Sequence, residues 1–182
     1  MPGIHHRAPG PVVATFENES ITLELVVDAV HVHPEVVRLA FAAAPGRIAI
    51  VTDAMAAAGS ADDDYKLGSL AVTVKDGQAV LRGTNTIASS TLTMDRALRV
   101  AMQIVGLSTR EAVEALTLAP ATALGLDKRL GLLAPGYAAD AVRLNHAWVV
   151  TGVWRDGTAR PHAFLQQKQR SAPLVLWPVL TH

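Results

Sequence analysis

Residues 48–55 read IAIVTDAM, an apolar run that ends abruptly in a threonine and an aspartate. An earlier β-rich run, ITLELVV, occupies residues 21–27, and between the two a helical pattern opens at residues 33–35 (HPE) and stops at residues 45–46 (PG). The second run spans residues 47–51, and both runs are almost uniformly apolar, as strands are when helices cover both faces of a parallel sheet. We therefore predict an α/β fold that contains a strand, a helix and a parallel second strand.

Polar residues follow each predicted strand. Residues 28–33 come after the first strand, and Thr52 and Asp53 come after the second. In α/β folds, ligands bind beyond the carboxyl ends of the strands, so we expect Asp53 at a rim shared with Asp28. An isolated aspartate after a strand is more often a helix N-cap or an ordinary loop acid. A carboxylate in this place can also act as a general acid/base or bind a metal.

Composition narrows the class of protein. The chain has 182 residues, of which 50% are hydrophobic and 18% charged, which is enough apolar surface for a core. Its formal net charge is zero, so no basic surplus is available for nucleic acid. It has no cysteine, so disulfides and thiolate chemistry are excluded and a cytoplasmic location is expected. Its apolar stretches are short and its first residues lack an apolar core, so we expect neither a membrane span nor a signal peptide.

The middle of the chain predicts a hairpin and a helix. Residues 56–68 are small and acidic and are expected to form a loop. Residues 70–82 predict a β-hairpin that turns at Asp76-Gly77, because Asp-Gly is a strong turn signal. The glycine- and hydroxyl-rich stretch of residues 83–92 is expected to be a loop that leads into a helix over residues 93–105.

The last third of the chain changes texture. Residues 108–111 (STRE) form a capping-box pattern that predicts a helix ending near Leu118. A short helix is expected from Ala119 to Gly125. Residues 129–160 predict a small β subdomain, with β-rich pieces at residues 146–150 and 153–155.

Two histidine clusters are candidates for chemistry. His31 and His33 would share one face of an extended segment, a geometry often found at zinc sites. The alternative is that one ring bonds the backbone and the other is solvated. The position of His31 three residues beyond Asp28 favours function. The other cluster, residues 5–7 (HHR), is a weak signal, although an arginine can bind phosphate or carboxylate bidentately.

Taken together, the motifs occur in one order: HHRAPGPV, DAVHVHP, IVTDAM, YKLG, LRGTNTIASSTLTMD, GLSTREAVEALTLAPATALGL and GLLAPGYAAD. In this order they resemble the N-acetylglucosamine-6-phosphate deacetylases of the amidohydrolase superfamily, over roughly residues 1–157. The resemblance implies the C-terminal half of a (β/α)8 TIM barrel in residues 1–128 and part of a small β-sandwich subdomain in residues 129–160. Residues 161–182 are expected to be a disordered tail.

The resemblance also implies a reaction, the hydrolysis of N-acetylglucosamine 6-phosphate to glucosamine 6-phosphate and acetate. In the family, the aspartate of the VTDA segment takes a proton from a metal-bound water and delivers it to the leaving amine, and by position it is Asp53. A divalent zinc or iron ion lowers the pKa of that water. The phosphate ligand of the RxPG segment is Arg7, and the histidine that contacts the sugar phosphate is His31.

Further substrate contacts are implied near these residues. Backbone contacts fall on Ile87, Ala88 and Ser89, and Asp28 is counted with the substrate-binding residues of the same rim. By contrast, His33 and His5 match no family ligand.

Three departures from the family pattern are visible. Ala29 and Ser89 stand where the family usually has glycine, and Ala141 replaces a leucine. If Ala29 or Ser89 requires a positive φ, its side chain costs about 1 kcal/mol or more.

The metal ligands of the family, one glutamate and two histidines, lie upstream of Met1 by this resemblance. The chain by itself is therefore expected to bind no metal, and to be inactive or active only with a partner that supplies them. Family members are commonly homodimers.

Two other interpretations stay open: a non-catalytic product of gene decay or a misassigned start, and another amidohydrolase that acts on cyclic amides. The second alternative shares the G-x-L-x-x-G-x-x-A-D texture but is not expected to share HHRAPG.

Overall fold

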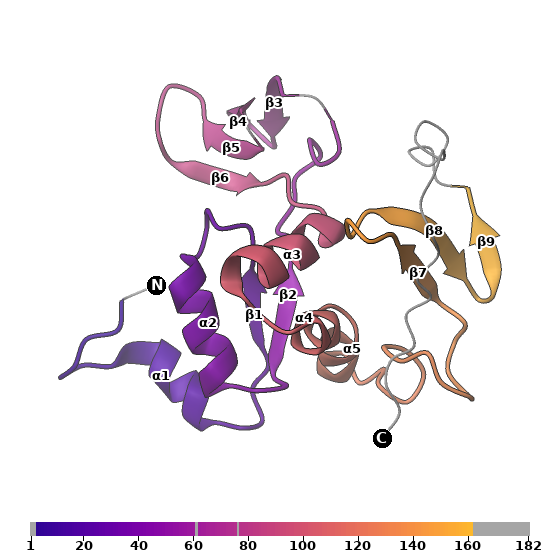
Figure 1. Cartoon of the computed structure of the whole chain (residues 1–182). Coiled ribbons are helices and arrows are strands. Elements are labelled where there is room, and N and C mark those ends of the chain that lie inside the picture. Colours follow the sequence, from indigo (N-terminus) through magenta and orange to yellow (C-terminus); the bar gives the residue numbers. More distant parts are fainter. Residues whose placement is uncertain (1–2, 61, 76, 162–182) are drawn as a thin grey trace. The chain divides into compact units, whose positions relative to one another are not determined.

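The computed structural model describes residues 3–60, 62–75 and 77–161. These residues form two compact units, one reaching to Leu116 and the other beginning at Thr117 (Figure 1). Helices and strands occur in both units, so the predicted α/β class is confirmed. No helix in the described part of the chain is both long and apolar enough to cross a membrane. The predicted disordered tail falls on residues 162–182, which lie outside the described residues.

The first unit is built on the strand, helix and strand that the apolar runs predict. Strand β1 (Leu23–Val26) pairs in parallel with β2 (Ile48–Val51), and helix α2 (Pro34–Ala43) connects them. Residues Ile48 and Ile50 are each only 1% exposed because helices cover the strand, as its uniform apolarity requires. The predicted parallel pair is confirmed.

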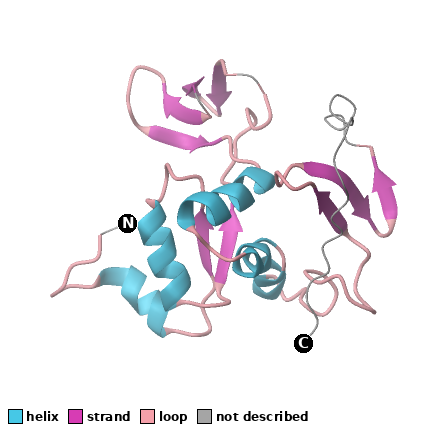
Figure 2. Cartoon of the chain, in the orientation of Figure 1, coloured by secondary structure: helices cyan, strands magenta, loops and turns pink. Residues whose placement is uncertain are grey.

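Three further helical segments belong to the same unit as β1, α2 and β2. Helix α3 (Met94–Val100) continues into the π-helical turn η1 (Ala101–Val105), and helix α4 (Thr109–Leu116) contacts β2. Figure 2 shows the two strands lying between α2 and α4. The Ser108 hydroxyl donates to the Glu111 carboxylate at 2.5 Å, and this bond lowers the pKa of Glu111. This bond confirms the predicted capping box. The helix predicted over residues 93–105 is confirmed by α3 and η1.

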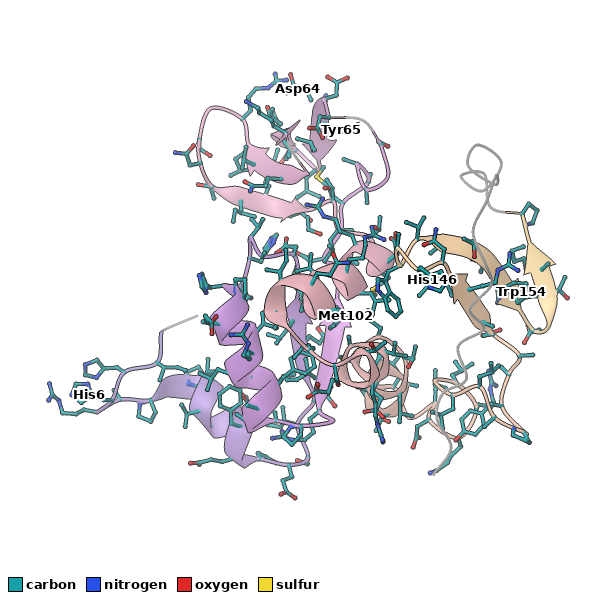
Figure 3. All side chains as sticks on the ribbon, in the orientation of Figure 1. His6, Asp64, Tyr65, Met102, His146 and Trp154 are labelled. Carbon is teal, nitrogen blue, oxygen red and sulfur yellow. The ribbon has the colours of Figure 1, made fainter. Side chains whose placement is uncertain are left out.

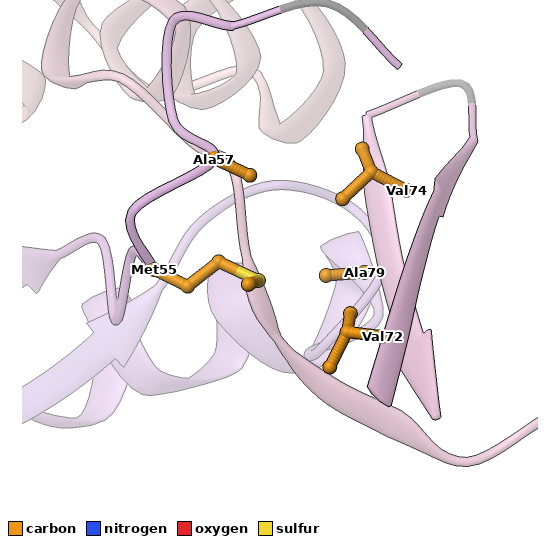
Figure 4. Packing of buried hydrophobic residues seen from close by; sticks show 5 residues of the cluster. All are labelled: Met55, Ala57, Val72, Val74 and Ala79. Atoms are coloured by element: carbon orange, nitrogen blue, oxygen red, sulfur yellow. The ribbon is translucent and has the colours of Figure 1, made fainter. Parts of the chain in front are cut away.

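An antiparallel sheet forms the rest of the first unit, in the strand order β3-β4-β5-β6. Its strands are β3 (Asp64–Leu67), β4 (Leu70–Lys75), β5 (Gln78–Leu81) and β6 (Ile87–Ser90). The paired strands β4 and β5 confirm the predicted hairpin, while Asp76 of the predicted turn lies outside the described residues. Figure 4 shows Met55 and Ala57 packed against the inner side chains of this sheet, which are Val72, Val74 and Ala79.

Two loop predictions in this region are wrong. Residues 64–67 form β3, because Tyr65 and Leu67 pack against the apolar cluster while the alternate residues face outward. Residues 87–90 form β6, whose serine hydroxyls bond the backbone of a neighbouring segment instead of marking a loop. In both strands tertiary pairing outweighs a composition that is typical of loops.

The second unit contains helix α5 (Leu118–Ala123) and an antiparallel sheet of β7 (Ala141–Leu144), β8 (Val150–Arg155) and β9 (Thr158–Arg160). The strand predicted over residues 146–150 is wrong. The Asn145 side chain accepts hydrogen bonds from the amides of Ala147 and Val149 and thereby closes a turn before β8.

Arg47 fixes the chain next to helix α1 (Gly10–Glu17), an element that the sequence analysis missed. Its guanidinium donates to the carbonyls of Thr15, Phe16, Asn18 and Ile21, at 2.7–3.2 Å. These carbonyls lie at and just beyond the end of α1, where no helical partner remains for them. The same arginine lines an open depression with Phe16, Glu17, Glu19, Ala43 and Pro45.

We predict that Arg47→Met lowers the free energy of unfolding by about 2 kcal/mol, because a charged donor shared by several carbonyls contributes more than a neutral one. Urea unfolding measures this change. The matched control is Arg110→Met, which removes only an exposed pair with Glu114 and is expected to change the value by less than about 0.5 kcal/mol. Equal effects of the two substitutions contradict the capping role of Arg47.

Candidate functional site

Asp28 and Asp53 occupy matching places at one edge of the parallel strands. Val26 and Val51 are partners in the β1–β2 register, and each aspartate follows its strand end by two residues. This edge is the carboxyl end of both strands, where α/β folds bind ligands. The two segments therefore place their polar groups at a common rim, which we call the strand-end site.

The Asp28 carboxylate orients His31. It accepts hydrogen bonds from the amides of Val30 and His31 at 2.9 Å each, and its other oxygen lies 2.7 Å from Nδ1 of the His31 ring. Burial alone would raise the pKa of Asp28, but these bonds outweigh it and lower the pKa below its ordinary value. An ionised Asp28 thus holds the ring by Nδ1, and Nε2 has no hydrogen-bond partner among the described residues.

His33 has a different task from His31. Its Nδ1 accepts a hydrogen bond from the amide of Glu35 at 3.3 Å, so it is the N-cap of α2. The segment bends after Asp28 and is not extended, and the two rings do not form the shared face that would suit zinc. Among the residues that the structure describes, no three His, Cys, Asp or Glu side chains come together as metal ligands.

Asp53 has an unusual backbone and an unengaged side chain. Its φ is +47°, in the left-handed region that few residues other than glycine adopt, and it is exposed. Its carboxylate makes no hydrogen bond with any described residue, and no helix follows it, so the N-cap alternative is not realised. A carboxylate presented in this way can accept a proton from, or donate one to, a bound molecule.

Strand β6 holds the backbone of Asp53. The Asp53 carbonyl accepts hydrogen bonds from the Ser90 amide at 3.0 Å and from the Ser89 hydroxyl at 2.5 Å, and the Met55 amide donates to Ser90 at 2.9 Å. These bonds continue the sheet across the site, as a parallel bridge between Ala54 and Ser90. The predicted contact segment of residues 87–89 therefore lies directly beside Asp53.

The three residues of that segment differ in exposure. Ile87 is 41% exposed, Ala88 packs partly against the apolar cluster, and Ser89 is 8% exposed. The φ of Ser89 is not positive, so its side chain is not strained, and its hydroxyl points to the Asp53 carbonyl. By contrast, Ala29 has a φ of +64°, which meets the condition for strain stated above.

Arg7 is not brought to the strand-end site by any contact. It is exposed, and its amide donates to the neighbouring His5 ring at 3.3 Å. Figure 3 shows its neighbour His6 at the far end of the segment before α1, away from the two strands. Asp28, His31, Asp53 and β6 thus lie at one edge of the parallel strands. Arg7 makes no described contact with any of them.

Sequence reasoning missed Ser90. It is 2% exposed, its hydroxyl donates to the Thr52 carbonyl, and the Leu92 amide donates back to it at 3.1 Å. The available signal was a pair of adjacent hydroxyls between apolar residues, which is typical of side chains that satisfy buried backbone groups.

We predict that Ala29→Gly raises the free energy of unfolding by about 1 kcal/mol, because glycine adopts a φ of +64° without a Cβ clash. Thermal and urea unfolding measure the change. The matched control is Ala101→Gly in a helical segment, where φ is −56°, and it is expected to destabilise by about 1 kcal/mol. Loss of stability in Ala29→Gly contradicts the strained conformation.

Comparison with known proteins gives the wider context. Residues 16–160 match the model of the amidohydrolase family. An N-acetylgalactosamine-6-phosphate deacetylase of Escherichia coli O157:H7 is 39% identical over 157 residues, which cover 86% of this chain and 41% of the relative. A shorter Escherichia coli K12 protein, provisionally named an N-acetylgalactosamine-6-phosphate deacetylase, is also 39% identical, and the match covers 93% of its length.

Solved structures of N-acetylglucosamine-6-phosphate deacetylases are also similar to the chain. The N-acetyl-D-glucosamine-6-phosphate deacetylase of Mycobacterium smegmatis, solved as an Asp-to-Ala mutant in complex with N-acetyl-D-glucosamine-6-phosphate, superposes with a TM-score of 0.81 and 42% identity. The match covers 87% of this chain and 42% of the enzyme, so the chain spans less than half of this relative. A family match over most of the chain, with similarity in both sequence and structure, shows that the chain belongs to the amidohydrolase family.

Proposed function

We propose that this chain provides the acid/base carboxylate of an enzyme that hydrolyses N-acetylglucosamine 6-phosphate to glucosamine 6-phosphate and acetate. One observation carries the proposal: the unengaged Asp53 carboxylate stands at the carboxyl end of two parallel strands, in a chain 42% identical to an enzyme solved with that substrate. The order of the sequence motifs supports the same reaction.

The chemistry assigned to this chain is proton transfer and orientation. Asp53 accepts a proton from the attacking water and then gives it to the nitrogen of the leaving amine, which general acid/base catalysis requires in amide hydrolysis. The Nε2 atom of His31 is available to the sugar phosphate because Asp28 holds the opposite side of the ring. The resemblance also implies a zinc or iron ion, but the described residues include no set of ligands for it, and the roles above belong to Asp53 and His31 alone.

The wider architecture is part of the same proposal. We infer that β1 and β2 are neighbouring strands of a (β/α)8 barrel within residues 1–128, and that β7–β9 belong to a small β sandwich within residues 129–160. The TM-score of 0.81 over 87% of the chain supports this inference. Phosphate binding by Arg7, the homodimer and the cytoplasmic location stay predictions.

N-acetylgalactosamine 6-phosphate is a second candidate substrate. It is the sugar in the names of both Escherichia coli relatives, each 39% identical to this chain. The two sugars are epimers with the same acetamido and phosphate groups, so the proposed role of Asp53 is the same for both.

We predict that Asp53→Asn lowers acetate release at least about 100-fold, because the amide cannot exchange the proton. Acetate is measured with each sugar phosphate and added zinc or iron. Since the chain covers 42% of the Mycobacterium smegmatis enzyme, it is assayed alone and together with the uncovered part of that enzyme.

Asp63→Asn is the matched control, since this exposed acid lies before β3 and its carboxylate bonds only the adjacent amide of Asp64 in the contacts described. It is expected to retain the parent rate. Full activity of Asp53→Asn, or no acetate release under either condition, contradicts the proposal.

A further inference from the structure

Two adjacent serines stand out among the described residues because they are buried. Ser89 is 8% exposed and Ser90 is 2% exposed, and they are the polar residues found in the otherwise apolar interior of the described chain. A buried hydroxyl needs a hydrogen-bond partner, since leaving it unpaired costs free energy. The partners of these two hydroxyls therefore indicate what the serines are for.

Both hydroxyls bond the same short stretch of backbone. Ser89 donates its hydroxyl to the Asp53 carbonyl at 2.5 Å, and Ser90 donates its hydroxyl to the Thr52 carbonyl. The Ser90 amide adds a third bond, to the Asp53 carbonyl at 3.0 Å. The two acceptors are consecutive carbonyls in the chain.

Consecutive carbonyls have a particular consequence for Asp53. The Thr52 carbonyl belongs to the rigid peptide plane before the Asp53 Cα, and the Asp53 carbonyl belongs to the plane after it. The angles φ and ψ of Asp53 are the rotations that relate these two planes. Holding both planes therefore fixes both angles, and with them the direction in which Cβ and the carboxylate leave the backbone.

The fixed conformation is one that an aspartate does not adopt readily. A φ of +47° is in the left-handed region, which costs a residue other than glycine about 1–2 kcal/mol. Such a conformation persists only where the surroundings determine it. Within the described structure, the bonds from Ser89 and Ser90 supply that constraint.

We infer that Ser89 and Ser90 are positioning residues, a hydroxyl clamp that holds both peptide planes of Asp53 and aims its carboxylate at the substrate. This inference rests on the proposed acid/base role of Asp53. Ser89 stands where the resembling family usually has glycine, so one bond of the clamp depends on a side chain that glycine lacks. The serine at position 89 thus adds a hydrogen bond that positions Asp53, and its hydroxyl points to the Asp53 carbonyl.

The test combines turnover with a spectroscopic probe of Asp53. Ser89→Ala is expected to lower kcat about tenfold, because a small misplacement of a catalytic group is costly, and to leave KM within about twofold. The 13Cα and 13Cβ chemical shifts of Asp53 report its φ and ψ and are expected to change in the same variant. Ser90→Ala is expected to act in the same direction, and Ser89→Ala decides the matter if Ser90→Ala does not fold.

Ser108→Ala is the matched control. It removes a hydroxyl from the capping box of α4, which weakens the fold without touching Asp53. It is expected to leave kcat and the Asp53 shifts unchanged. A wild-type kcat in Ser89→Ala overturns the clamp, and so do unchanged Asp53 shifts.

The outcomes separate this inference from the proposed function. If Asp53→Asn abolishes turnover and Ser89→Ala keeps the parent kcat, the clamp is wrong and the proposed function stands. If Asp53→Asn leaves turnover unchanged, or no turnover occurs, the proposed function is wrong. The chemical shifts of Asp53 then still show whether the serines determine its conformation.

Discussion

The first unit depends on the short bridge between the segment after β2 and strand β6. The Asp53 carbonyl accepts from the Ser90 amide, and the Ser90 carbonyl in turn accepts from the Met55 amide, so a hydrogen-bonded bridge links the parallel strands to the antiparallel sheet. Without these bonds Asp53, two residues beyond the buried strand, would be an ordinary loop acid. With them, its backbone is held on both sides and its carboxylate is left for chemistry.

The same rim contains a second strained residue, Ala29, which follows the counterpart of Asp53 on the neighbouring strand. Ala29 and Asp53 both have a positive φ, and each lies in the turn that leaves one of the paired strands. Strained backbone of this kind collects at functional sites, where surrounding bonds maintain it. At Ala29 the neighbouring support is the Asp28 carboxylate, which accepts from the amides of Val30 and His31 and so closes a tight turn. Each strand end is thus organised by a polar group that bonds local backbone.

The sequence predicted those parts of the structure whose cause is local. The parallel pair follows from the apolarity of two short runs, and α4 follows from the capping box of Ser108. The strands β3 and β6 were not predicted, because their composition is polar and only pairing with the adjacent strands β4 and β5 makes them part of a sheet. The sequence favoured a function for His31 over His33, but it could not show that Asp28 holds the His31 ring or that His33 caps α2. The role of Ser90 was not predicted, because the partner of its hydroxyl depends on which segment lies beside β6.

The proposed function requires the strand-end site to bind an amino-sugar phosphate. The most direct test is a titration of the 15N-labelled chain with glucosamine 6-phosphate, followed by the amide chemical shifts. We expect saturable changes at His31, Asp53 and Ser89, and none at Arg47, which lines the depression beside α1. Changes confined to the Arg47 region, or no saturable change at the strand-end site, contradict the proposed function.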